Sequence, residues 1–355
     1  MSRPARARID LDALRHNYQL ARSTHGGRAL AVLKADAYGH GALACASALA
    51  PLADGLAVAF SDEAVALRAG GIRAPILVLE GVFAPAELSL AHEQQLSLVL
   101  HHEEQLRMLE ASQLPLRSID VWLKVDSGMR RAGFPLASVA SAHARAKACS
   151  AVRNTVLMTH FARADEPGSD ATARQIDDFD RATTHLQGER SLANSAAILA
   201  WPQARRDWAR PGILLYGADP LAARQHGLRP VMTLESEIFA TRELQAGEGL
   251  GYGHAFVAER AMRIGLVAMG YADGYPRAAP SGTPVAVDGR PSRLAGRVSM
   301  DMLPVDITDL PEARIRSRVE LWGANVDINA VASAAGTIAY ELLCNVKRVK
   351  KSYLA

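Results

Sequence analysis

A lysine at the end of a short apolar run is the first residue in this chain whose type and position could support covalent chemistry. The segment LAVLKADAYGHGA, residues 30–42, places Lys34 there and follows it with Tyr38, Gly39 and Gly41. An amine that is removed from water loses its proton more readily and can then condense with an aldehyde. Backbone N–H groups in such a loop, together with a phenol, can bind an anion. The alternative is a lysine at a strand end whose charged head reaches solvent.

The rarity of lysine favours the chemical role for Lys34. Lysine accounts for only six of the 40 Lys and Arg residues, so arginine carries nearly all of the positive charge. Arginine keeps its proton in proteins and is a poor nucleophile, whereas lysine can be deprotonated and can form an imine. A lysine kept at the end of an apolar run is therefore a candidate for covalent catalysis.

Eight apolar runs of strand length recur through the first 216 residues, with helical periodicity between them. Nearly continuous apolar strands that alternate with helices are typical of a parallel sheet, and eight such units predict a closed (β/α)8 barrel of the TIM type. The runs are Ala29–Lys34, Leu56–Phe60, Ile76–Glu80, Leu96–Leu100, Ile119–Val125, Val156–His160, Ser191–Asn194 and Ile213–Tyr216.

Polar residues stand at the C-terminal ends of four of these predicted strands. Barrel enzymes gather their reactive groups at that end, because the loops there converge over one mouth. The residues in question are Lys34, Lys124, His160, and Asn194 with Ser195. Phosphate is frequently held by the loops after the seventh and eighth strands, where Ser195 and Gly212 lie. An imine-forming lysine combined with a phosphate site suggests pyridoxal phosphate.

The pattern of apolar residues along the sequence changes after about Asp219. Alternating or β-branched runs broken by Gly and Pro predict a second, mostly β domain. We expect the barrel to span residues 1–225 and the β domain residues 226–355, with the join in residues 221–228. In the second domain, GYADGYPR presents Tyr271 in a turn that is either purely structural or part of a site.

Composition favours a small-molecule partner and a cytoplasmic location. The formal net charge of +3 is small and the basic residues are scattered, so no footprint for nucleic acid stands out. No apolar run approaches the roughly 18–20 residues of a membrane span, and Asp10 and Asp12 fall where the apolar core of a signal peptide would lie. The three cysteines fit neither a disulfide framework nor a zinc site, so we expect no metal.

Together these motifs resemble those of alanine racemases, which are pyridoxal-phosphate enzymes with an N-terminal barrel and a C-terminal β domain. The segment AVLKADAYGHG is similar to the cofactor-lysine signature of that family without a gap. THFARADE, NSAA, RPGILLYG, GYADGYPR and GRVSMDM follow in the family order, so the resemblance covers essentially the whole chain.

The resemblance implies interconversion of L-alanine and D-alanine by two bases. Lys34 would form the internal aldimine and exchange the α-proton on one face of the external aldimine, and Tyr271 of the partner subunit would act on the opposite face. Inversion at Cα requires a proton to leave one side and return from the other, so two bases must flank a planar carbanion. A head-to-tail homodimer is implied as well. The reaction would either supply D-alanine for peptidoglycan or serve alanine breakdown.

The resemblance also implies roles around the cofactor and the substrate. The residues that would surround the phosphate are Tyr38, Ser195, Gly212, Ile213 and Tyr340, with Asn194 close by. Arg210 would face the pyridine nitrogen, and His160 would support it. Arg131 would meet the cofactor phenolate or the substrate carboxylate, and Met300 would line the pocket through its backbone. Lys124 matches a lysine that is often carbamylated in relatives, and an ion pair with Asp126 is the alternative. Arg130 departs from the pattern, since a glycine is common there.

Arg210 distinguishes a racemase from the other functions that this fold and cofactor would allow. An arginine beside the pyridine nitrogen keeps that nitrogen unprotonated, which makes the ring a weaker electron sink and suits racemisation better than decarboxylation or transamination. A decarboxylase of the same fold would place an acidic residue at that position. A non-catalytic carrier of the cofactor would typically have the barrel alone, without the roughly 130 residues after Asp219.

Overall fold

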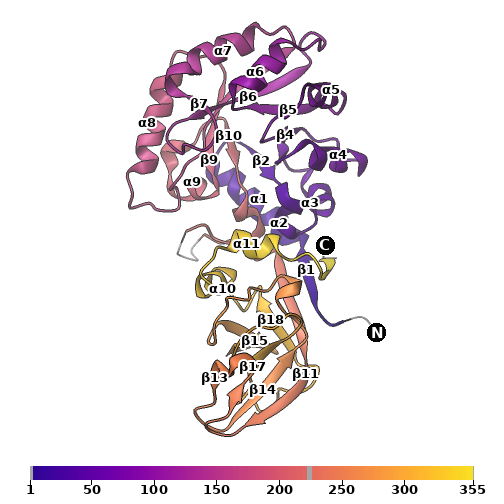
Figure 1. Ribbon diagram of the computed structural model, residues 1–355. Helices are drawn as coiled ribbons and strands as arrows, with labels where there is room; N and C mark the ends of the chain where they lie inside the picture. Colours follow the sequence, from indigo (N-terminus) through magenta and orange to yellow (C-terminus); the bar gives the residue numbers. More distant parts are fainter. Residues whose placement is uncertain (1–2, 222–225, 355) are drawn as a thin grey trace.

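The computed structural model describes residues 3–221 and 226–354 and shows two parts, a helix-covered barrel and a smaller sheet domain (Figure 1). Eight parallel strands close the barrel, because the first and last of them pair with each other and the fourth pairs with the fifth. In barrel order they are β2 (Arg28–Val32), β3 (Gly55–Val58), β4 (Ile76–Val78), β5 (Leu96–Leu100), β6 (Ile119–Asp126), β8 (Val152–Met158), β9 (Glu189–Asn194) and β10 (Trp208–Arg210). The predicted barrel is confirmed.

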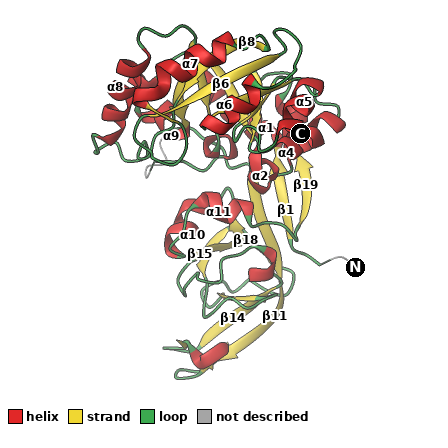
Figure 2. Ribbon diagram, turned by 45° about the horizontal axis from the view of Figure 1, so that its top comes forward, coloured by secondary structure: helices red, strands yellow, loops and turns green. Residues whose placement is uncertain are grey.

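Helices surround this barrel on its outside (Figures 1 and 2). They are α1 (Leu11–His25), α3 (Ala42–Leu49), α4 (Ser61–Ala69), α5 (Pro85–Glu93), α6 (Glu103–Glu110), α7 (Val139–Ala148), α8 (Ala171–Thr183) and α9 (Ser195–Ala200). The short segment α2 (Lys34–Gly39) follows β2 directly, at the end of the barrel that faces the second domain (Figures 1 and 2). Helix α1 shows how local sequence sets the bounds. Asp10 accepts a hydrogen bond from the backbone N–H of Ala13 at its start, and Gly26 at φ 81° ends it in the left-handed conformation.

The predicted eighth strand, Ile213–Tyr216, is wrong. These residues form a 3-10 helix, η3 (Ile213–Tyr216), and the eighth strand is β10, which ends at Arg210. Pro211 has no N–H to donate to a ladder, and Gly212 turns the chain at φ −118° and ψ −93°. A short apolar run cannot by itself distinguish a strand from a buried helical turn. The other seven predicted runs all overlap barrel strands.

The second domain is built mostly of strands, as predicted. Its main strands are β11 (Met232–Leu244), β14 (Met262–Val267), β15 (Pro284–Val287), β16 (Arg290–Arg293), β17 (Leu303–Asp306), β18 (Arg318–Trp322) and β19 (Lys350–Leu354). Two short helices, α10 (Ile328–Ala334) and α11 (Ala339–Cys344), lie between this sheet and the barrel (Figure 1). The main hydrophobic core runs without a break from the barrel strands into these elements.

The N-terminal strand β1 (Arg6–Asp10) belongs to the second sheet, which was not expected from the sequence. It lies between β11, to which it is antiparallel, and β19, to which it is parallel. The strands β1 and β19, near the two ends of the chain, therefore pair within one sheet.

The division into residues 1–225 and 226–355 stays a prediction. Part of the predicted join, residues 222–225, lies outside the described residues.

Candidate active site

Lys34 lies at the C-terminal end of β2 and begins a turn whose backbone is left-handed. The next four residues, Ala35 to Tyr38, all have φ between 52° and 55°, which is the left-handed region. That conformation costs roughly 1–2 kcal/mol for each residue other than glycine, so neighbouring groups must hold it. Strained backbone of this kind concentrates at functional sites.

Two side chains from other elements tie this turn. Glu63 of α4 accepts a hydrogen bond from the backbone N–H of Ala35 at 2.6 Å. Lys351 of β19 lies 2.5 Å from Asp36, whose other carboxylate oxygen accepts from the N–H of Ala42. The C-terminal strand therefore holds the turn that carries Lys34.

A cradle for an anion lies beside this turn, between α9 and η3. The hydroxyl of Ser195 accepts from the N–H of Gly212 at 2.8 Å and from that of Leu214 at 3.3 Å. The N–H of Ile213 opens η3 and has no acceptor within that helix. A Cβ at Gly212 would lie 2.5 Å from the hydroxyl oxygen of Tyr38, so only glycine lets that phenol reach the cradle.

Asn194 and Tyr340 flank the cradle. Asn194 begins α9, and its side chain accepts from the N–H of Ala197 at 3.0 Å, so it orients the helix that carries Ser195. Tyr340 comes from α11 in the C-terminal part, and its ring centroid lies 5.9 Å from that of Tyr38. The structure therefore brings these two residues to Tyr38, Ser195 and the start of η3.

Arg210 lies buried at the end of β10 and is held by neutral oxygens. One terminal nitrogen donates to the backbone and hydroxyl oxygens of Ser191 at 2.9 and 2.6 Å, and the other donates to the backbone oxygen of Thr159 at 2.5 Å. Within the described part of the chain, Arg210 has no carboxylate partner and its Nε makes no hydrogen bond. Burial lowers its pKa to about 10, so it stays cationic near neutral pH and has a donor to spare.

His160 supports Arg210 from the end of β8. Its Nδ1 lies 3.4 Å from a terminal nitrogen of Arg210 and can accept from it. Burial, and then the positive charge of Arg210, lower the pKa of His160 well below its usual value. A neutral imidazole next to a buried guanidinium leaves the positive charge on the arginine.

Lys124 projects from β6 among cations. Burial lowers its pKa to about 8, with Arg131, Arg210 and Lys34 adding to the effect and Glu80 opposing it. The alternative ion pair with Asp126 is not formed, because that carboxylate accepts instead from the backbone N–H groups of Gly128 and Arg130 at 3.0 and 2.9 Å.

The loop after β6 carries Arg130 and Arg131, both exposed. Arg130 has φ 56°, a left-handed conformation that favours glycine, which gives a physical reason for the glycine common in the resembling family. Arg131 makes no hydrogen bond to a side chain or backbone group among the described residues, so its guanidinium is available to a ligand.

The two motifs of the second domain lie against each other. The backbone N–H of Tyr271 donates to Ser299 at 3.0 Å, and that of Ala272 donates to the backbone oxygen of Met300 at 3.0 Å. The residues Tyr271 and Met300 are 37% and 58% exposed. No hydrogen bond, ion pair or ring contact among the described residues joins Tyr271 to Lys34 of the same chain.

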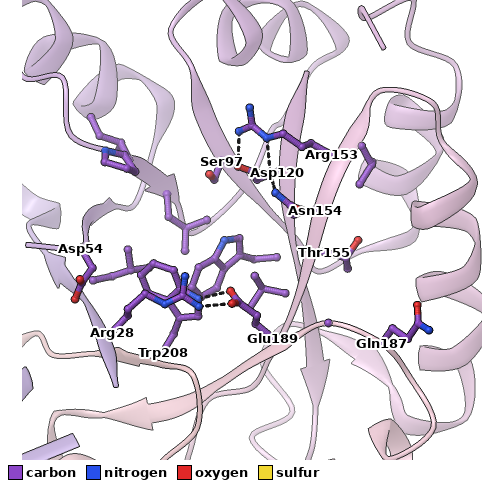
Figure 3. Close-up of a pocket in the computed structure, with 18 of the residues that line it drawn as sticks. Arg28, Asp54, Ser97, Asp120, Arg153, Asn154, Thr155, Gln187, Glu189 and Trp208 are labelled. Carbon is purple, nitrogen blue, oxygen red and sulfur yellow. Dashed lines mark hydrogen bonds and ion pairs between the residues drawn. The ribbon is translucent and has the colours of Figure 1, made fainter. Parts of the chain in front are cut away.

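A cavity of about 640 Å³ opens at the opposite end of the barrel and is a poor candidate for this chemistry (Figure 3). It is lined by residues from the beginnings of the strands, including Arg28, Trp122 and Trp208. Four of its charged groups already form ion pairs with each other, since Arg28 pairs with Glu189 and Arg153 with Asp120. Reactive groups of barrel enzymes lie at the other end.

The residues at the C-terminal mouth fit pyridoxal phosphate. The cradle that a Cβ at Gly212 would fill suits a phosphate, and the unpaired Nε of Arg210 suits an unprotonated ring nitrogen. Lys34, at the start of the neighbouring turn, carries the kind of amine that such an aldehyde could condense with. Sequence reasoning missed His40 and Glu63, whose roles depend on contacts between separate elements.

Comparison with known proteins gives consistent results over the whole length. The chain matches the family models "Alanine racemase, N-terminal domain" at residues 9–220 and "Alanine racemase, C-terminal domain" at residues 231–353. It is 66% identical over 351 residues to an alanine racemase of Azoarcus sp. strain BH72, with 99% of both chains covered.

Solved structures agree with this match. The biosynthetic alanine racemase of Pseudomonas aeruginosa superimposes with a TM-score of 0.96 at 49% identity, covering 100% of both chains. The alanine racemase of Bartonella henselae, solved with covalently bound pyridoxal phosphate, gives a TM-score of 0.90 at 27% identity over 99% of this chain and 100% of that one. No helix in the described ranges of the present chain is long and apolar enough to cross a membrane.

Proposed function

Because the chain belongs to the alanine racemase family, we propose that it is an isomerase that interconverts L-alanine and D-alanine with pyridoxal phosphate as its cofactor. The observation that carries this proposal is the buried Arg210, which is held only by neutral groups and has an unused Nε donor. A guanidinium in that place keeps a ring nitrogen unprotonated, because protonation would put two positive charges together. A decarboxylase would need the opposite charge there.

Pyridoxal phosphate, when bound, supplies an aldehyde that condenses with amines and a ring that accepts electron density from Cα. The residues that would hold it are those of the cradle and its neighbours. The phosphate would be bound by Ser195, Gly212, Ile213 and Tyr38, with Asn194 and Tyr340 at its edge. Arg210 and His160 would lie at the ring nitrogen, and Lys34 at the aldehyde.

Two bases would move the proton at Cα of alanine. We assign Lys34 to one face and Tyr271 of the partner subunit to the other, because a single base tends to return the proton to the side from which it came. At the neighbouring Lys124, burial lowers the pKa to about 8, and the charges of Arg131 and Arg210 add to the effect.

A head-to-tail homodimer would complete the site. Tyr271 and Met300 lie on adjoining segments of the second domain and are exposed, since the backbone N–H of Tyr271 bonds to Ser299 and that of Ala272 bonds to Met300. Among the described residues, no hydrogen bond, ion pair or ring contact joins Tyr271 to Lys34 of its own chain. An isologous interface would bring this pair to the barrel mouth of a second copy, and the same operation would complete the second site.

Substrate recognition would come from charge at one end and crowding at the other. The free guanidinium of Arg131 suits the substrate carboxylate or the cofactor phenolate, and a carbamate on Lys124 would orient it. Tyr271 of the partner subunit and Tyr340 would crowd the side chain at Cα, which favours methyl.

The three cysteines are all unpaired in the structure, which supports a reducing compartment such as the cytoplasm.

The test is to incubate the purified protein with L-alanine in D2O and to follow optical rotation together with deuterium at Cα. We expect loss of rotation and incorporation of solvent deuterium at Cα in both enantiomers. Release of carbon dioxide, or the absence of any exchange, would reject the proposal. Replacing Lys34 with Ala should abolish the cofactor's imine absorbance.

A further inference from the structure

His40 lies directly behind the turn that carries Lys34 and has no role in the function proposed above. Its side chain is fully buried, and its Nδ1 lies 3.0 Å from the backbone oxygen of Ala37 and 2.9 Å from that of Tyr38. Both of these oxygens are acceptors, so Nδ1 must carry the proton and donate to them. Burial lowers the pKa of His40 to about 4, so near neutral pH the ring is neutral and its Nε2 is unprotonated.

This arrangement leaves a buried acceptor without a partner. The Nε2 of His40 makes no hydrogen bond to any described residue. An unsatisfied buried polar atom costs roughly 1–3 kcal/mol, so a leucine of similar size would be cheaper if the position only needed filling. The hydrogen bonds on the Nδ1 side must therefore contribute something that packing alone would not.

Three stacked rings connect the turn to the phosphate cradle. The rings of His40 and Tyr216 have centroids 4.5 Å apart, and those of Tyr216 and Tyr38 are 4.7 Å apart, both with interplanar angles of 28°. Tyr216 ends η3, whose first residue Ile213 and preceding Gly212 form the cradle, and the Tyr216 hydroxyl donates to the backbone oxygen of Val32 at 2.8 Å. The stack thus spans from β2 to the cradle.

The turn needs such a tie because its own backbone does not favour it. Four consecutive left-handed residues without glycine would relax toward other conformations if they were not held. Glu63 and Lys351 hold its first half, at Ala35 and Asp36. His40 holds its second half, at Ala37 and Tyr38, next to the phenol that reaches the cradle.

We propose that His40 is a positioning residue whose Nδ1–H clamps the backbone oxygens of Ala37 and Tyr38 and thereby fixes the Lys34 amine and the Tyr38 phenol toward the cofactor. Its importance for the cofactor rests on the proposed function, whereas the clamp on the turn does not. His40 itself touches neither cofactor nor substrate in this account.

The chain permits a matched set of variants. His40→Asn keeps an N–H donor at the position of Nδ1, His40→Gln moves the donor to the position of Nε2, and His40→Leu removes it. His143→Leu is the control, because that histidine is also buried and bonds through Nε2 to the backbone oxygen of Gln187 at 2.8 Å, near the other end of the barrel.

Two measurements separate the clamp from the cofactor. Hydrogen exchange with mass spectrometry reports the amides of residues 33–42 in the full-length protein with and without pyridoxal phosphate, and equilibrium dialysis gives the dissociation constant of pyridoxal phosphate. For His40→Leu and His40→Gln we expect roughly tenfold faster exchange in this segment and roughly tenfold weaker cofactor binding. His40→Asn should stay within about threefold of wild type in both, and His143→Leu should change neither.

Wild-type exchange in His40→Leu would overturn the proposal, and so would a loss in His40→Asn equal to that in His40→Gln, since packing alone would then explain the effect. If His40→Leu does not fold, the Asn and Gln variants still give the comparison. Wild-type protein that fails to bind pyridoxal phosphate would reject the proposed function, while exchange in the cofactor-free protein would still test the clamp.

Discussion

Arg210 and His160 form a buried pair in which a guanidinium nitrogen lies 3.4 Å from an imidazole Nδ1. No carboxylate neutralises this pair among the residues that the structure describes, and burial followed by the charge of Arg210 lowers the pKa of His160 well below its usual value. The positive charge therefore stays on the arginine, whose Nε makes no hydrogen bond to a described residue. This relationship is what distinguishes the proposed racemisation from other reactions of the same cofactor.

Replacing Arg210 with Glu should redirect the chemistry. A carboxylate would accept a proton shared with the ring nitrogen and would deepen the electron sink, so we expect kcat for racemisation to fall on the order of 100-fold while pyruvate formation by transamination rises relative to it. Arg210→Lys keeps the charge and should not raise that ratio. Pyruvate and the two enantiomers can be followed by chromatography, and an unchanged ratio in Arg210→Glu would refute the assigned role.

A methyl group at Gly212 should close the phosphate cradle. The Cβ of Gly212→Ala would lie 2.5 Å from the hydroxyl oxygen of Tyr38, and the φ of −118° with a ψ of −93° lies outside the regions that alanine favours, so backbone strain adds to the clash. We expect affinity for pyridoxal phosphate to drop at least about tenfold, and the Tyr38→Phe background to recover part of the loss because it removes the clashing atom. Equilibrium dialysis of the two single variants and the double variant measures this coupling, and additive losses would contradict it.

Lys124 should react with carbon dioxide as the pH rises. Its pKa is lowered to about 8, first by burial, so the neutral amine that carbamylation requires becomes abundant about two pH units below the value for an ordinary lysine. We expect a carbamate signal from carbon-13-labelled bicarbonate that grows between about pH 6 and 9 and is absent in Lys124→Ala. Lys147, which bonds to Gln187 at the far end of the barrel, serves as an internal comparison. A signal that persists in Lys124→Ala would place the carbamate elsewhere.

His40 should make the fold sensitive to mild acid. Burial lowers its pKa from 6.5 to about 4, so the unfolded chain binds a proton more readily than the folded one. The free energy of unfolding is therefore at its full value above about pH 6.5. It decreases as the pH falls toward 4, by up to about 3 kcal/mol, because the unfolded state gains a proton that the folded state does not bind.

His40→Asn provides the reference, because asparagine does not titrate. The difference in the free energy of unfolding between wild type and His40→Asn, measured by urea denaturation, should shift against the wild type as the pH is lowered through this window. A difference that stays constant from pH 7 to 4 would show that His40 is not buried as a neutral ring.

Apolar patterning predicted the barrel well because its strands are buried on both faces and read as short continuous runs. It failed at Ile213–Tyr216, where Pro211 and Gly212 redirect an equally apolar run into a 3-10 helix. The strand β1 was not expected from the sequence either, since its partners β11 and β19 lie more than 200 residues away. Long-range pairing of this kind leaves no local signal.

The site shows a similar division. The strand-end rule pointed to Lys34, Lys124, His160, and Asn194 with Ser195, and the structure places all of them at one end of the barrel. The left-handed turn after Lys34 could not be foreseen, because alanine and tyrosine carry no signal for positive φ and one aspartate does not predict four such residues in a row. His40 stood in the motif from the start, but its role appears only when its ring is seen against Tyr216 and two backbone oxygens.

The central claim is that Lys34 of one chain works with Tyr271 of the partner subunit, and mixing two inactive variants tests it most directly. Lys34→Ala and Tyr271→Phe should each be nearly inactive alone. After the two are unfolded and refolded together, statistical pairing puts both variants in about half of the dimers, each with one intact site of two, so about one quarter of wild-type activity should return. Mixed dimers that form, as shown by differently tagged chains, but recover no activity would contradict the shared site.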